Sequence, residues 1–293
     1  MKMKRFHRVV VGTDFTPGAV RAARRALCLP LARAATIELI HAAPANAPRA
    51  FEAVVKRAAL TALDRQAAAL ARRAGVSPPR IHKSLASGTP VDALTREVVA
   101  RRGEMLVVGA HADHGLPDLD LGSTAERLLA ASAAPVLIVK RPGRLPYRHA
   151  LVAVDPGGSS ARALALAMVL VREARGRVTL LHAIELPVEA GVRLAGTSAV
   201  ELERLRDRSL DEAARFLAAG ARRVRGAGLA VDWVLSDLEA RSAILRTARR
   251  LRADLVAMGT RRRRDRTGFL IGSVARWVAR RAACDVLVAR ANP

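Results

Sequence analysis

The pattern of the first half of this sequence returns in its second half, and this repeat constrains the fold more than any other feature. Matching segments follow in the same order, namely 7–14 with 148–155, 36–42 with 177–183, 104–109 with 254–259, and 135–139 with 285–289. The first two pairs are offset by 141 positions and the last two by 150, so the second copy carries nine extra residues. A repeat of this length predicts two similar domains in tandem.

The two copies join in a short segment that contains proline and glycine. Arg141-Pro-Gly-Arg-Leu-Pro146 has the composition of a linker, because these residues interrupt regular structure. We therefore expect a first domain over residues 1–141, a linker over residues 142–147 and a second domain over residues 148–293.

Each copy alternates apolar runs with segments of helical spacing. In the first copy the pattern predicts strands over 8–13, 36–43, 80–86, 104–109 and 135–140, and helices over 17–33, 50–74, 89–102 and 122–133. The second copy repeats this order, with its extra length in the 186–198 connection or in the helix that follows. Such alternation is typical of a parallel sheet covered on both faces, so we expect an α/β protein of two tandem doubly wound domains. Their ligands would bind at the carboxyl ends of the strands.

Composition excludes several classes of protein. Hydrophobic residues make up 51% of the chain, but the longest uncharged apolar run, 128–139, is shorter than the about 18 residues of a membrane helix. No apolar signal segment follows the basic N-terminus, and the two cysteines, Cys28 and Cys284, form no disulfide framework or zinc motif. We therefore expect a cytoplasmic protein without a membrane partner, and we expect both cysteines to be small buried residues.

The net charge of +24 raises the question of an anionic partner. The charge is spread along the chain, because residues 1–141 carry 22 basic and 11 acidic residues and contribute +11. Aromatic residues make up only 3%, too few for the stacking platforms of a single-strand binder, so we expect no specific nucleic-acid partner. The densest basic run, 261–266, is either a solvated loop or a contact for an anion.

A glycine-containing loop follows the fourth predicted strand of each copy. The first copy has Gly109, and its next helix opens with Gly122-Ser123, while the second copy has Gly259 and Gly272-Ser273. Free N–H groups at such a helix start, together with the helix dipole, form a physical cradle for phosphate. A carboxylate ends the first strand of each copy, across the expected crevice, where it could accept hydrogen bonds from adenine or ribose.

These features resemble the universal stress protein family, in a tandem form that covers nearly the whole chain. The segments that carry the resemblance are Val-Gly-Thr-Asp14 and Val-Ala-Val-Asp155, His41-Ala and His182-Ala, Gly88-Thr-Pro90 and the two glycine loops. The resemblance implies a five-stranded parallel sheet in each domain, of the adenine nucleotide alpha hydrolase-like type. It also implies domain pairing through the last strands, within one chain or in a homodimer.

The resemblance further implies a stress-response protein that binds ATP, with or without magnesium, as a regulatory ligand in at least one domain. The implied contacts in the first copy are Gly12, Asp14, Ala42, Val108, Gly109, His111, Ala112, Gly122, Ser123 and Thr124. Those in the second copy are Asp155, Ala183, Met258, Gly259, Arg261, Arg262, Gly272, Ser273 and Val274.

Both copies depart from the family's nucleotide-binding pattern at its second glycine. Ala112 occupies that position in the first copy and Arg262 in the second. The arginine could neutralise a phosphate through a charge-assisted bond, or it could fill the cradle. The alternative function is therefore a tandem scaffold with degenerate nucleotide sites that acts through protein–protein contacts.

Simpler structural explanations exist for several of these residues. Asp14 and Asp155 could cap turns, the Gly-Ser pairs could be ordinary helix starts, and His41 and His182 are expected to be satisfied histidines at strand ends. The second copy has no equivalent of the cluster at 111–120 with its two histidines and three aspartates, so we expect no metal. The chain has no P-loop, Gly-x-Gly-x-x-Gly, His-Glu-x-x-His or Gly-x-Ser-x-Gly motif, so we expect a binding protein and not an enzyme, with slow ATP hydrolysis left open.

Overall fold

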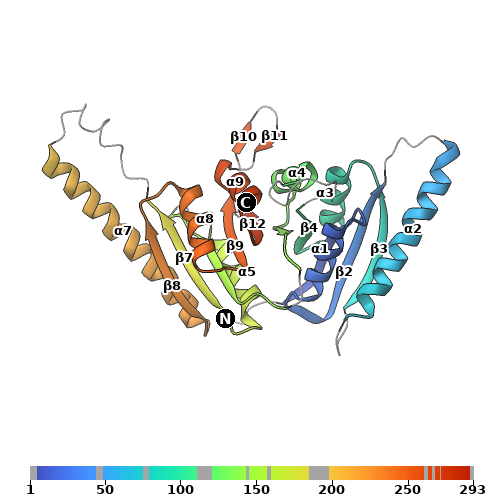
Figure 1. The fold of residues 1–293 in the computed structure, drawn as a ribbon, viewed down its shortest axis with the longest axis horizontal. Coiled ribbons are helices and arrows are strands. Elements are labelled where there is room, and N and C mark those ends of the chain that lie inside the picture. Colours follow the sequence, from blue (N-terminus) through green and yellow to red (C-terminus); the bar gives the residue numbers. More distant parts are fainter. Residues whose placement is uncertain are drawn as a thin grey trace.

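The computed structural model describes most of the chain, and within it the two copies form two similar halves of one sheet (Figure 1). The described residues are 5–43, 49–74, 79–110, 121–142, 145–156, 160–184, 198–260, 263–265, 268–270 and 272–290.

The first half alternates strands and helices in the expected order. Its strands are β1 (Phe6–Gly12), β2 (Leu31–Ala43), β3 (Arg80–Ser87), β4 (Met105–Gly109) and β5 (Val136–Val139). Its helices are α1 (Pro17–Leu27), α2 (Arg49–Ala71), α3 (Pro90–Ala100) and α4 (Ser123–Ala131). Thr16 and Thr89 cap α1 and α3 with their hydroxyls, and a proline occupies the first turn of each helix, as the sequence predicts.

The second half repeats this order and adds a hairpin. Its strands are β6 (His149–Ala153), β7 (Arg177–Ala183), β8 (Ala230–Ser236), β9 (Leu255–Thr260) and β12 (Asp285–Arg290), and the hairpin is β10 (Arg263–Asp265) with β11 (Gly268–Leu270). Its helices are α5 (Ala161–Arg172), α7 (Ala199–Gly226), α8 (Ala240–Arg250) and α9 (Ser273–Arg281). No helix of the described residues is long and apolar enough to cross a membrane.

The main sheet has ten strands in the order β3-β2-β1-β4-β5-β12-β9-β6-β7-β8. Neighbouring strands are parallel within each half, so each half is a doubly wound five-stranded parallel sheet, as predicted. The strand order reverses between β1 and β4 in the first half and between β6 and β9 in the second. These two reversals are where such folds place a ligand crevice.

The two halves meet through their last strands. β5 and β12 pair antiparallel, with Leu137 opposite Leu287. The pairing that the family resemblance implies is therefore present within this chain, and it makes one continuous sheet out of two.

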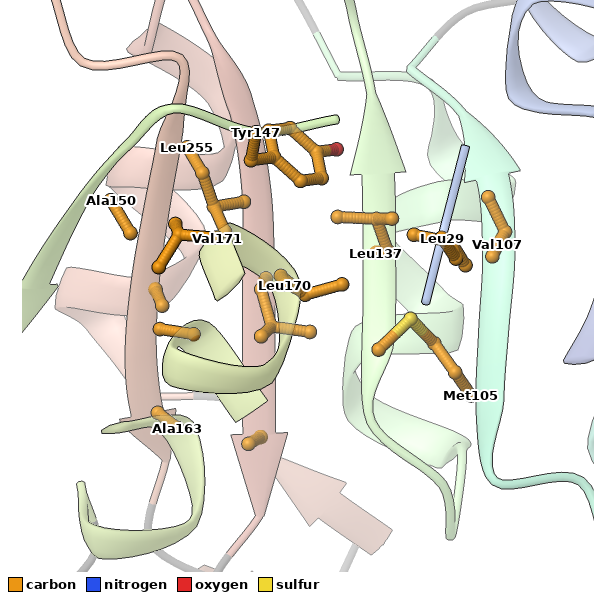
Figure 2. Packing of buried hydrophobic residues seen from close by; sticks show 14 of the residues in the cluster. Leu29, Met105, Val107, Leu137, Tyr147, Ala150, Ala163, Leu170, Val171 and Leu255 are labelled. Carbon is orange, nitrogen blue, oxygen red and sulfur yellow. The ribbon is translucent and has the colours of Figure 1, made fainter. Parts of the chain in front are cut away.

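Helices cover both faces of the sheet, and each face has a core that runs through both halves. Buried residues of α1, α2, α5 and α7 pack on one face, and those of α3, α4, α8 and α9 pack on the other. Figure 2 shows the first core where it crosses between the halves, with Leu170 of α5 and the ring of Tyr147 facing Leu137 of β5.

One predicted helix boundary is wrong. The helix predicted over 17–33 ends at Leu27, and β2 begins at Leu31 instead of residue 36. The backbone N–H of Cys28 closes the last turn of α1, and Pro30 cannot continue a helix. Leu31 pairs instead with Phe6, which extends β2 along the start of β1.

Part of the extra length of the second copy lies in a longer helix. The helix α7 has 28 residues, whereas its counterpart α2 has 23. The other predicted location, the 186–198 connection, lies outside the described residues except for Ser198, the N-cap of α7.

A buried polar cluster joins the halves beside the β5–β12 pair. The carboxylate of Asp285 is fully buried. Its Oδ2 accepts hydrogen bonds from Arg25 Nε at 3.0 Å and from the Tyr147 hydroxyl at 2.7 Å. Its Oδ1 accepts from the backbone N–H groups of Lys140 at 2.8 Å and Arg141 at 3.0 Å. This seam cluster, as we call Arg25, Tyr147 and Asp285, links α1, the segment before β6, and β12.

A second set of contacts joins the halves through α4 and α9. Glu126 of α4 forms ion pairs with Arg276 and Arg280 of α9, each at 3.0 Å. The Lys140 Nζ donates to the carbonyls of Arg280 at 2.9 Å and Ala282 at 2.8 Å, where α9 ends. A cation at a helix C-terminus stabilises the helix through its dipole.

Candidate functional site

The sheet brings the predicted site residues of each half to its carboxyl edge. In the first half β1 and β4 are neighbours, so Gly12 and Asp14 lie beside the end of the strand that carries Val108 and Gly109. In the second half β6 and β9 are neighbours in the same way, which places Asp155 beside the strand of Met258 and Gly259. Ala42 and Ala183 occupy equivalent places near the ends of β2 and β7.

Two of the helices that start at this edge, α4 and α9, have a glycine and no side-chain cap at their N-termini. The helices α4 and α9 begin after Gly122 and Gly272, and neither start has a side-chain cap. Side chains cap α1, α3, α7 and α8, whereas α5 also starts without a side-chain cap. The first N–H groups of an uncapped helix are available to an anion.

The cap residues themselves are anchored, and the residues after them are exposed. The N–H of Gly122 donates to the carbonyl of Ala110 at 2.8 Å, and that of Gly272 donates to the Thr260 hydroxyl at 3.3 Å. Ser123 and Ser273 follow on the surface, as does Thr124, whereas Val274 is partly buried. Both helix starts are thus held in place with their next N–H groups directed outward.

Both carboxylates at the ends of β1 and β6 bind within their own turns. Asp14 accepts hydrogen bonds from the backbone N–H of Thr16 at 3.1 Å and from its hydroxyl at 2.6 Å. The Ser160 hydroxyl donates to Asp155 Oδ1 at 3.2 Å and accepts from the Asp155 N–H at 3.1 Å. Sequence reasoning named both aspartates and missed Ser160, although a serine just before a helical run is a common N-cap signal.

The two strand-end histidines have structural roles that are the same in both halves. His41 Nδ1 lies 2.8 Å from the carbonyl oxygen of Thr13, and His182 Nδ1 lies 2.9 Å from that of Val154. Each ring also contacts a phenylalanine, Phe15 in the first half and Phe216 in the second. The prediction of satisfied histidines at strand ends is therefore confirmed.

The glycines of the predicted site differ in whether a side chain would fit at their positions. A Cβ on Gly109 would lie 2.7 Å from the carbonyl carbon of Gly18, so this glycine allows α1 to pack closely on β4. A Cβ on Gly12 would lie 2.7 Å from Leu94 Cδ1. A Cβ on Gly272 would meet only the Thr260 hydroxyl, at an ordinary 3.6 Å. Close packing therefore explains why residues 12 and 109 are glycines, whereas the packing around residue 272 does not require a glycine there.

A cavity of about 200 Å³ opens at the carboxyl edge of the second half. Predicted site residues line much of it, namely Asp155, Ala183, Met258, Gly259 and Val274. Much of the remaining wall consists of Ser160, His182, Ala240 and Ile244. Strand ends, α8 and the first turn of α9 thus line one open pocket. We call it the edge cavity.

Several predicted residues lie outside the described residues. These are His111 and Ala112 of the first half and Arg261 and Arg262 of the second. The basic run continues into β10, which pairs antiparallel with β11, so part of the predicted loop is a short hairpin. This hairpin was missed because three-residue strands leave no periodic signal.

The described residues contain no group of three or more histidines, cysteines, aspartates or glutamates that could hold a metal ion. The cluster at 111–120 lies outside them. Of the two cysteines, Cys284 is buried as predicted, whereas Cys28 is only partly buried. Burial raises the pKa of the Cys284 thiol to about 11, which keeps it protonated.

Comparison with known proteins identifies the same family in both halves of the chain. The model of the universal stress protein family matches the chain twice, over residues 5–140 and 146–290. Universal stress protein Rv2623 of Mycobacterium tuberculosis is 30% identical over 225 residues, which cover 74% of this chain and 70% of that protein. Universal stress protein YxiE of Bacillus subtilis is 24% identical over 147 residues, which cover 49% of this chain and 99% of that protein.

Solved structures share the fold of the whole chain. A universal stress protein from Archaeoglobus fulgidus aligns with a TM-score of 0.71 and 17% identity, covering 98% of this chain and 99% of that one. A second structure, from Pseudomonas aeruginosa, aligns with a TM-score of 0.63 and 18% identity, covering 99% and 95%. At a sequence identity of 17% or 18% this similarity shows a shared fold only, and the shared fold covers both halves of the chain.

Proposed function

The chain belongs to the universal stress protein family as a tandem two-domain stress-response protein, and from this premise we propose that it binds an adenine nucleotide as a regulatory ligand in its second half. The edge cavity carries the proposal. It lies where the strand order reverses between β6 and β9, and five of its lining residues are among the nucleotide contacts that the family resemblance implies.

The size of the edge cavity favours the nucleoside end of the ligand. A volume of about 200 Å³ is smaller than a typical pocket for a whole drug-sized molecule. Its walls are mainly apolar, with Met258, Ile244 and Val274 among them, which suits a purine ring. The Asp155 carboxylate and the Ala183 backbone supply polar groups at its rim. The phosphates would then extend out of the cavity.

The start of α9 is the partner for those phosphates. Its N-terminus has no side-chain cap, and Val274 of its first turn lines the edge cavity. The N–H groups at a helix N-terminus and the positive end of the helix dipole both favour a phosphate. Arg261 and Arg262 precede this helix in the sequence and would add charge-assisted bonds to phosphate oxygens.

The same helix links the proposed site to the seam between the halves. Val274 in the first turn of α9 lines the edge cavity, while Arg276 and Arg280 of the same helix pair with Glu126 of the first half. The C-terminal carbonyls of α9 accept the Lys140 ammonium. A nucleotide that orders the start of α9 would therefore stabilise contacts between the halves, which is a physical route for regulation.

Isothermal titration calorimetry with ATP and magnesium tests the proposal, together with chromatography of nucleotide released by heating the purified protein. Ala183→Leu places a branched side chain in the edge cavity and should weaken ATP binding about 10-fold or more. Ala42→Leu is the matched control, because residue 42 holds the equivalent place in the first half. It should leave the affinity within about 2-fold of the original.

Two outcomes would contradict this proposal. Loss of binding with Ala42→Leu but not with Ala183→Leu would place the site in the first half. No released nucleotide, together with no heat of ATP binding by the unaltered protein, would favour the scaffold alternative. A melting curve for each variant separates lost binding from lost folding.

A further inference from the structure

A second and larger cavity lies along one side of α1 in the first half. Its volume is about 1140 Å³, and its lining shares no residue with the predicted nucleotide contacts. Five arginines line it, namely Arg5, Arg21, Arg24, Arg33 and Arg73. They come from four segments, which are the start of β1, α1, the start of β2 and the end of α2. We call this space the arginine cavity.

The positive charge of the arginine cavity is poorly compensated. Its only acidic lining residue, Glu173, forms an ion pair with Arg5 at 3.1 Å. Within the part of the chain that the structure describes, the guanidinium groups of Arg21, Arg24, Arg33 and Arg73 have no ion pair. The sequence also has no Asp or Glu over residues 15–37 or 65–91, which supply most of the lining. Four arginines therefore line one space without an ion-pair partner among the described residues.

One of these arginines has an unmet hydrogen bond. The Nε–H of Arg21 is shielded from solvent and has no acceptor among the described residues. A buried donor without an acceptor is energetically unfavourable. An anion in the cavity would supply acceptor oxygens for this arginine. Arg24, Arg33 and Arg73 are exposed, so their side chains are able to turn toward such a ligand.

The floor of the arginine cavity is apolar. Val20 and Leu27 of α1 line it, as do Leu29 and Leu31 at the start of β2. A purely ionic ligand would leave this surface in contact with water. The combination of an apolar floor and a basic rim fits a molecule with an apolar body and an anionic head group.

The second half offers an internal comparison. With the offset of 141 that relates residue 14 to 155 and 41 to 182, the positions of Arg5, Arg24 and Arg33 are occupied by Pro146, Ala165 and Ala174. The shared fold therefore does not require arginines at these places. Arg21 is the exception, because Arg162 occupies its matching position, so Arg5, Arg24 and Arg33 are the part of the rim that belongs to the first half alone.

We propose that the arginine cavity binds a small amphipathic phosphate, with its alkyl or aryl body on the floor and its phosphate held by the arginines. Arginine suits this head group, because its planar fork of N–H donors matches phosphate oxygens in bidentate geometry. The volume exceeds that of most small-molecule pockets, so it accommodates both parts of such a ligand. This site is separate from the nucleotide site proposed above and does not depend on it.

Calorimetric titration of the full chain with octyl phosphate tests this site, at physiological salt so that long-range attraction is screened. Octyl glucoside has the same body with a neutral head, and inorganic phosphate has the head without the body. Octyl phosphate should bind at least about 10-fold more tightly than either control. The double variant Arg24→Gln/Arg33→Gln should weaken its binding about 10-fold or more.

A charge-matched variant separates the cavity from general attraction. Arg204 and Arg208 are exposed on α7 in the other half, and Arg204→Gln/Arg208→Gln removes the same charge. This control should change the affinity by no more than about 2-fold. The proposal is overturned if octyl phosphate does not bind, if either control ligand binds as tightly, or if both double variants weaken binding equally. The four replaced arginines are all exposed, namely Arg24, Arg33, Arg204 and Arg208. Both double variants should therefore have melting temperatures close to that of the unaltered protein.

Discussion

The seam cluster should contribute strongly to stability, and Arg25→Met is the substitution that tests it. Arg25 is 6% exposed and donates to Asp285 and to the carbonyl of Leu145, with its guanidinium 4.3 Å from the centre of the Tyr147 ring. Methionine retains much of the apolar stem but removes the cation. The Asp285 carboxylate would then remain buried with three of its four hydrogen-bond donors and without its ion-pair partner.

The expected magnitude follows from the burial of both partners. Removing one member of a buried ion pair costs about 3–5 kcal/mol, because the other charge stays in a low dielectric. We expect Arg25→Met to lower the free energy of unfolding by about 4 kcal/mol, and Asp285→Asn by about 3 kcal/mol because the amide keeps one acceptor oxygen. The double variant buries no lone charge, so it should cost about 4 kcal/mol instead of the about 7 that independent sites would give.

Urea denaturation followed by two probes measures both the stability and the coupling of the halves. Both tryptophans, Trp233 and Trp277, lie in the second half, so their fluorescence reports mainly that half. Far-UV circular dichroism reports the helices of both halves. The two transitions should coincide in the unaltered protein and separate in Arg25→Met, because the variant weakens the link between the halves.

Arg24→Met serves as the matched control for this experiment. Arg24 precedes Arg25 on the same helix but is exposed, so its replacement should change stability by no more than about 0.5 kcal/mol. The reasoning would be refuted if Arg25→Met behaved like Arg24→Met. Additive costs of Arg25→Met and Asp285→Asn in the double variant would refute it equally.

Three further predictions concern close packing and titration. Gly109→Ala should cost about 2 kcal/mol or more in urea denaturation, because its Cβ would lie 2.7 Å from the backbone of α1, whereas Gly272→Ala should cost at most about 1 kcal/mol. Burial lowers the pKa of Lys140 to about 8, so between pH 8 and 9 the unfolded chain holds more of that proton and this group makes stability rise with pH. The Cys284 thiol opposes the rise, because burial raises its pKa from 9.0 to about 11. The test is therefore the difference between the unaltered protein and Lys140→Met, which should lose the contribution that rises with pH in the same assay. Burial raises the pKa of Tyr147 well above 10.0, so stability should fall with pH above about 10, and Tyr147→Phe should lessen this fall in melting curves at a cost of about 1 kcal/mol at neutral pH.

Local patterns were sufficient to predict the fold. Apolar runs alternating with helical spacing predict strands and helices, and recurrence of the pattern at offsets of 141 and 150 predicts two similar halves. Boundaries were less certain where two tendencies compete, as at Leu31, where pairing with Phe6 extends β2 into a segment of helical composition. Tertiary pairing overrides local preference at such a place.

The candidate site was predictable only in part. Periodicity and motif spacing bring Asp155, Ala183 and Met258 to one edge, but they do not reveal that the structure forms an open cavity there. The seam cluster had no sequence signal at all, because Arg25 and Asp285 are 260 positions apart. A charged residue inside an apolar pattern shows that something unusual is buried, and only the packed structure shows its partner.

The seam also bears on how this chain can associate with others. Lys140 and Arg290 occupy positions related by the offset of 150, and each reaches across to the end of a helix in the other half, Lys140 to Ala282 and Arg290 to Leu129. The same kind of contact is thus made in both directions across the seam, as it would be in a symmetric pair of domains. The Arg25–Asp285 contact occurs once, because the matching positions are Leu166 and Pro135.

Two identical domains related by a two-fold axis would form every contact twice. This chain therefore carries an asymmetry at its seam that a symmetric homodimer of single domains lacks. The hydrogen-bonding edges of β5 and β12 are already occupied by each other, which leaves β3 and β8 as the outer strands of the main sheet. A homodimer of this chain, if it forms, must use a surface other than the last strands.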